Sequence, residues 1–74
     1  MRKVFILRVT TNVMVGEEPA IMLWAVETSS PEKALDAVEK QVPTNWAVKL
    51  TDYELTPATI RRLKLVPDQP RSLA

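Results

Sequence analysis

The stretch from Ala20 to Val26 is an unbroken run of seven apolar residues, with Gly-Glu-Glu-Pro before it and Ser-Ser-Pro shortly after it. The run is too short to cross a bilayer, so protein must bury it, and the turn-forming flanks predict a strand. Because side chains alternate between the two faces of a strand, both faces of the sheet are apolar here. The sequence therefore predicts a strand that needs cover on both sides.

The chain has 74 residues and contains neither cysteine nor histidine. A single domain of this size buries only about 60% of the surface of its unfolded chain, and no disulfide can reinforce it. A second copy or a bound partner is the remaining common way to enlarge the core. Without histidine and cysteine, the chain also lacks the usual near-neutral acid–base side chain and the thiolate metal ligands.

A net charge of +1 conceals two basic ends and an acidic middle. Residues 1–15 carry three basic side chains and no acid, residues 16–54 carry eight acids against three lysines, and residues 55–74 carry four basic side chains against one acid. The basic ends can serve an anionic partner, or they can attract the acidic middle of the same chain.

The alternating positions of residues 3–10 and 46–54, together with the apolar run of residues 20–27, predict three strands. In the first strand, Lys3, Phe5, Leu7 and Val9 form the better candidate for the core face. Residues 11–19, which include the only glycine, are expected to form a hairpin loop of about nine residues, longer than the usual two to five.

Two serine-or-threonine plus proline pairs predict the starts of two helices. The first helix begins at Ser30–Pro31, or one residue earlier through a capping box of Ser29 and Glu32, and ends before Pro43. The second begins at Thr56–Pro57 and runs to about residue 65.

Together these elements predict a small α+β domain of order β-β-α-β-α. We expect a three-stranded, mainly antiparallel sheet in the order 2-1-3, with one helix packed on a face and a short C-terminal helix. Residues 1–66 form the single domain, and residues 67–74 a disordered tail. Two points stay open: whether the second helix covers the second sheet face, and which side of the second strand meets the first helix.

The apolar second face suggests a function in protein contact. If the short second helix leaves that face open, the exposed apolar area exceeds what a monomer usually shows. We therefore expect a protein partner or a second copy in a homodimer, bound through a candidate interface of Val4, Ile6, Met22, Trp24 and Val26.

The alternative is a small nucleic-acid-binding or regulatory protein, which we consider less favoured. It would use a basic patch formed by the first strand and the second helix, namely Arg2, Arg8, Arg61, Arg62 and Lys64. No helix-turn-helix, zinc-finger or RNA-binding sheet pattern supports it.

No arrangement of residues indicates catalysis. Asp52 and Glu54 are two residues apart on a predicted strand, a spacing better explained by a solvated strand end. We expect no enzyme activity, no cofactor and no metal site. The first apolar run has four residues before Arg8 interrupts it, which is shorter than a signal peptide requires. We therefore expect no signal peptide, no membrane partner and a cytoplasmic location.

Overall fold

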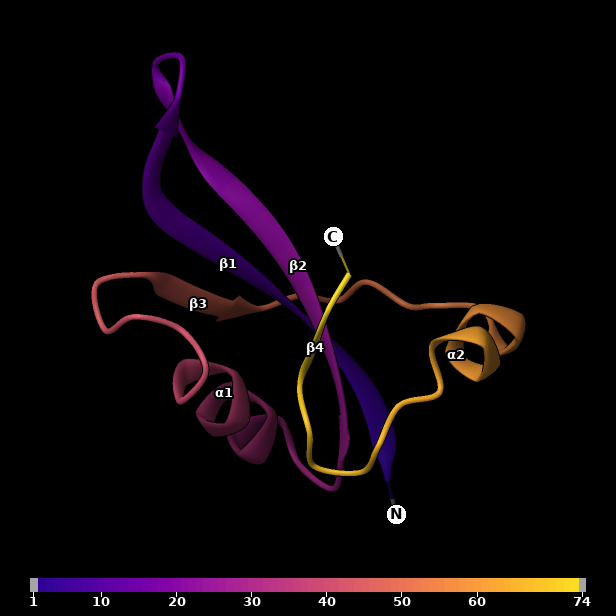
Figure 1. Cartoon of the computed structure of the whole chain (residues 1–74). Coiled ribbons are helices and arrows are strands. Elements are labelled where there is room, and N and C mark those ends of the chain that lie inside the picture. Colours follow the sequence, from indigo (N-terminus) through magenta and orange to yellow (C-terminus); the bar gives the residue numbers. More distant parts are fainter. Residues whose placement is uncertain (1, 74) are drawn as a thin grey trace.

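The computed structural model describes residues 2–73 and contains an antiparallel sheet and two helices (Figure 1). The predicted small α+β fold is confirmed at this level. The elements, in chain order, are β1 (Lys3–Val15), β2 (Glu18–Thr28), α1 (Pro31–Glu39), β3 (Ala47–Leu50), α2 (Pro57–Leu63) and β4 (Arg71–Ser72).

The sheet has four strands in the order β3-β1-β2-β4, so the prediction of three strands in the order 2-1-3 is wrong. The three expected strands keep their relative order, and the difference is the addition of β4 at the free edge of β2. This strand comes from the segment after Pro67, which we expected to be a disordered tail. The backbone N–H of Leu73 continues the pairing with a hydrogen bond to the carbonyl of Leu23 at 2.8 Å.

The β1–β2 hairpin is longer than predicted, and the expected nine-residue loop is absent. β1 continues to Val15 and β2 starts at Glu18, which leaves only Gly16 and Glu17 between the strands. Gly16 adopts a φ of 68°, a left-handed conformation that glycine accepts at no steric cost and that tight hairpin turns require. The valines and methionine of residues 13–15, which we placed in the loop, therefore belong to a strand.

One face of the sheet packs against α1 and forms the core. Residues directly opposite each other in antiparallel strands share a face. Leu7 lies opposite Trp24 and Val9 opposite Met22, so the even-numbered side of β2 meets α1. The core cluster consists of Leu7, Val9, Val26, Ala34, Val38 and Val42. The sequence left open which side of the second strand meets the first helix, and the structure shows that it is the even-numbered side. The structure also confirms the predicted core face of the first strand.

The opposite face of the sheet, which we call the far face, is covered only in part. Ile6 and Ala25 lie opposite each other on it and are 2% and 0% exposed. After β3, Thr51 binds the carbonyl of Ile6 through its backbone N–H and its hydroxyl, at 3.0 and 2.8 Å. The chain then leads to α2, which lies on the other side of the hairpin from β3 (Figure 1). The Arg71 side chain donates a hydrogen bond to the carbonyl of Leu63 and so attaches the end of α2 to β4.

Both helix starts follow the capping residues that the sequence indicated. The Ser30 hydroxyl accepts the backbone N–H of Lys33, and the Thr56 hydroxyl accepts that of Thr59, each at 3.2 Å. Ser30 is therefore the cap of α1, which resolves the choice between Ser29 and Ser30. The third strand is shorter than predicted: it ends at Leu50, and Thr51 directly after it still donates its backbone N–H to the carbonyl of Ile6 in β1.

Candidate interaction surface

The five apolar residues of the predicted interface do not lie on one face of the sheet. Met22, Trp24 and Val26 lie opposite Val9, Leu7 and Phe5, on the side that α1 covers. Val4 and Ile6 lie on the far face, opposite Glu27 and Ala25. Val26 and Ile6 are also buried. The grouping failed because every position of residues 20–26 is apolar, so the sequence does not distinguish the two sides of the strand.

The exposed apolar residues gather instead on the outer half of the β1–β2 hairpin, which we call the arm (residues 11–22). Large apolar side chains that stay more than half exposed here are Val13, Met14, Val15 and Ile21, at 56%, 57%, 68% and 58%. Met14 lies opposite Pro19 and Val15 opposite Glu18. Because consecutive residues of a strand point to opposite faces, the arm is apolar on both faces.

The arm also has two free edges. β3 pairs with β1 only between Leu7 and Thr10, and β4 pairs with β2 only at Trp24 and Ala25. Within residues 2–73, no third strand pairs with the part of the hairpin beyond these positions. Figure 1 shows the consequence, since the hairpin projects well beyond the rest of the molecule. The molecule measures 39 Å along its longest axis and 23 and 19 Å along the others.

The base of the arm is held by specific hydrogen bonds. The pairing register shifts between Thr10 and Met14, which marks an irregularity in β1. Thr11 is 6% exposed, and its hydroxyl donates to the carbonyl of Ala20 at 3.0 Å and accepts the N–H of Val13 at 3.1 Å. The indole N–H of Trp46 donates to Oδ1 of Asn12 at 2.8 Å. The arm therefore leaves the sheet from an anchored position.

The residues of the predicted basic patch are only partly brought together. Arg2 forms an ion pair with Asp68 at 3.2 Å, so a carboxylate of the chain already neutralises it. Arg8 lies directly opposite Lys49 of β3. The remaining three, Arg61, Arg62 and Lys64, lie in the last turn and at the cap of α2, on the other side of the hairpin from β3. The five predicted residues thus lie in three separate places: the paired Arg2, Arg8 on β1, and the three cations of α2.

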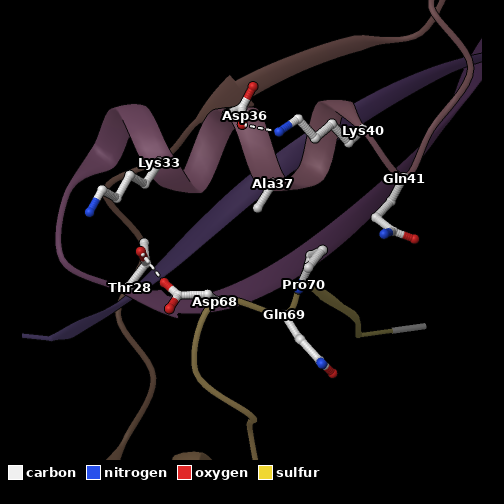
Figure 2. A pocket seen from close by; sticks show the side chains of 9 residues that line it. All are labelled: Thr28, Lys33, Asp36, Ala37, Lys40, Gln41, Asp68, Gln69 and Pro70. Carbon is white, nitrogen blue, oxygen red and sulfur yellow. Dashed lines mark hydrogen bonds and ion pairs between the residues drawn. The ribbon is translucent and has the colours of Figure 1, made fainter.

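A pocket of about 590 Å³ lies between α1 and the segment before β4 (Figure 2). It is lined by Thr28, Lys33, Asp36, Ala37, Lys40, Gln41, Asp68, Gln69 and Pro70. Two of its acids have partners beside them in the lining. Asp36 and Lys40 form an ion pair at 2.8 Å, and the Thr28 hydroxyl donates to Asp68 at 2.7 Å.

These contacts change the acidity of two groups in the pocket. The hydrogen bond from Thr28, and then the one from Arg2, lower the pKa of Asp68 below its ordinary value. The hydrogen bond and charge of Asp36 raise the pKa of Lys40. The contact of Thr28 with Asp68 could not be predicted from the sequence, because the two residues are 40 positions apart and no local pattern marks them. We interpret the polar side chains that line the pocket as contacts that hold the C-terminal segment against β2 and α1.

The acidic pair Asp52 and Glu54 is exposed and lies beyond the end of β3. Among residues 2–73, no group of three or more histidine, cysteine, aspartate or glutamate side chains could hold a metal ion. In the same part of the chain, no helix is long and apolar enough to cross a membrane. Comparisons of the chain with protein-family models, with curated proteins and with solved structures found no match.

Proposed function

We propose that the protein is a non-enzymatic interaction module that forms a homodimer through the arm. The observation that carries the proposal is the group of four large apolar side chains that stay more than half exposed on a projecting, two-stranded part of the sheet: Val13, Met14, Val15 and Ile21. The proposal replaces the interface that the sequence suggested, because α1 covers Met22, Trp24 and Val26 and because Val4 and Ile6 lie on the opposite face.

The physical argument concerns the stability of a two-stranded ribbon in water. An isolated hairpin is marginally stable, and it gains stability from a third strand or from packing against another surface. Strand edges that natural proteins leave open are usually protected by lysine, proline or a bulge. Between Val9 and Val26 the chain has no lysine or arginine, and its only charges are Glu17 and Glu18 at the turn. Pro19 and the register shift between Thr10 and Met14 interrupt the edges only at those positions. A partner that covers the arm removes both the open edges and the exposed apolar area.

Light scattering across a concentration series tests the proposal. We expect the mass to approach twice the 8.4 kDa of one chain as the concentration rises. The variant Met14→Glu/Ile21→Glu should stay at the mass of one chain, because it places charges on the arm without touching the core. Tyr53→Glu is the matched control: Tyr53 is 53% exposed but lies outside the arm and outside α2, so this variant should dimerise like the wild type. A wild-type monomer at every concentration contradicts the proposal.

A second candidate function, nucleic-acid binding, is favoured by one observation. Arg8 and Lys49 lie directly opposite each other on neighbouring strands, and like charges in this position repel. A phosphate backbone would relieve that repulsion. In a gel-shift assay over a range of salt concentrations, Arg8→Gln/Lys49→Gln should reduce the slope of log affinity against log salt by about 2. Lys33→Gln on α1 is the control, and no shift at low salt excludes this function.

A further inference from the structure

We infer that the arm of each copy docks against the basic end of α2 in the other copy, with Glu17 and Glu18 facing Arg61 and Arg62. The inference rests on the proposed homodimer and adds where the arm binds. Two such contacts, related by a two-fold axis, close the dimer, because each copy donates one arm and offers one α2.

The first support is complementary charge. The only charges between Val9 and Val26 are the two glutamates at the turn, and the only charges between Thr56 and Pro67 are those of Arg61, Arg62 and Lys64. The arm is therefore purely acidic, and the α2 segment is purely basic. Opposite charges of this kind favour encounter and fix the orientation of two partners.

The second support is that these charges are not used within one copy. In residues 2–73 the ion pairs join Arg2 to Asp68 and Asp36 to Lys40, and neither involves the glutamates of the turn or the cations of α2. Figure 1 shows the turn and α2 at separate extremities of the molecule. Because the two lie at separate extremities of one copy, the contact requires α2 of a neighbour.

The third support is a matching apolar component. Beside the cations, Val66 is 52% exposed, and Leu63 and Leu65 are only half-buried. None of the residues of α2 is buried, although the helix is attached to β4 by Arg71. The surface around α2 thus combines exposed apolar area with positive charge. The arm combines exposed apolar area with negative charge.

Charge exchange between two variants tests this placement. The variant Glu17→Lys/Glu18→Lys should be monomeric at concentrations where the wild type is a dimer, because its arm then faces Arg61 and Arg62 of an identical copy. Arg61→Glu/Arg62→Glu should also be monomeric, because its α2 then carries acids that face Glu17 and Glu18 of an identical copy. When the two variants are mixed, each arm meets an α2 of opposite charge, so a dimer should form again in a 1:1 ratio. We expect each variant alone to raise the dissociation constant at least tenfold.

The outcomes separate this inference from the proposed function. If the wild type dimerises and the charge variants dimerise equally well, or if their mixture stays monomeric, the docking site on α2 is wrong while the homodimer stands. If the wild type is a monomer at all concentrations, both fail. Far-UV circular dichroism checks that each variant is folded. Two milder variants repeat the test without like-charge repulsion, namely Glu17→Gln/Glu18→Gln and Arg61→Gln/Arg62→Gln. Each of them should weaken the dimer.

Discussion

The indole N–H of Trp46 donates a hydrogen bond to Oδ1 of Asn12 at 2.8 Å and links the segment before β3 to the base of the arm. The two residues are 34 positions apart in the sequence. Asn12 lies where the β1–β2 register shifts, and it is exposed. The contact therefore holds the arm to the body at the point where the pairing with β3 stops.

Removing this hydrogen bond should destabilise the fold by a measurable amount. We expect Trp46→Phe to lower the free energy of unfolding by about 1 kcal/mol, the typical net value of one hydrogen bond. A double-mutant cycle with Asn12→Ala, followed by urea unfolding, isolates the pair from the loss of ring area. A coupling energy close to zero would show that the contact does not stabilise the protein.

Trp24 presents the opposite case, because its indole N–H is buried and has no hydrogen-bond partner within residues 2–73. A buried, unpaired donor costs about 1–3 kcal/mol. Trp24→Phe removes that donor but also removes ring volume beside the core cluster, and the two effects oppose each other. We expect the free energy of unfolding to change by less than about 1 kcal/mol, whereas Leu7→Ala should cost about 2–5 kcal/mol. A loss above about 2 kcal/mol for Trp24→Phe would contradict this account.

The hydrogen bond from Thr28 to Asp68 predicts that the stability of the fold depends on pH. The pKa of Asp68 is lowered in the folded chain, first by the hydrogen bond from Thr28 and then by that from Arg2. A carboxylate with a lowered folded pKa stabilises the fold above its unfolded pKa, about 3.9 for aspartate, and this contribution is lost as pH falls through the folded pKa. Asp68→Asn and Thr28→Val should both flatten the decline in melting temperature below about pH 4. An unchanged decline in both variants would contradict this role.

The Arg71 side chain should determine how stably α2 is formed. Its side chain donates to the carbonyl of Leu63, one of the last carbonyls of the helix, which have no partner within the helix itself. Arg71→Ala should raise the hydrogen-exchange rates of the α2 amides several-fold and leave those of the β1–β2 ladder unchanged. Arg71→Lys keeps a charged donor and should retain most of the protection. Equal exchange in all three proteins would show that α2 is held by other contacts.

Local signals predicted the helix starts well, because a cap depends on residues only three positions apart. Ser30 and Thr56 accept the backbone N–H groups that the sequence indicated. The length of the arm could not be predicted in the same way. Val13, Met14 and Val15 are exposed in the single chain, so no burial within it distinguishes a strand from an apolar loop.

β4 was missed for a different reason. Arg71 and Ser72 have no strand-forming pattern of their own, and their pairing depends on the free edge of β2 and on Asp68, whose N–H binds the carbonyl of Glu27 at 2.8 Å. The ion pair of Arg2 was also not predicted, because its partner Asp68 lies in the segment that we expected to be a disordered tail. Contacts between distant segments decided each of these outcomes.

The strand order β3-β1-β2-β4 also determines the order in which one chain folds. The two central strands are neighbours in sequence and pair across a two-residue turn, so the hairpin can form early and quickly. β3 and β4 then attach to opposite edges of it and do not compete for the same hydrogen bonds. We therefore expect unfolding to begin at either edge, and the last structure to open on both routes is the central part of the β1–β2 ladder, where Leu7 pairs with Trp24.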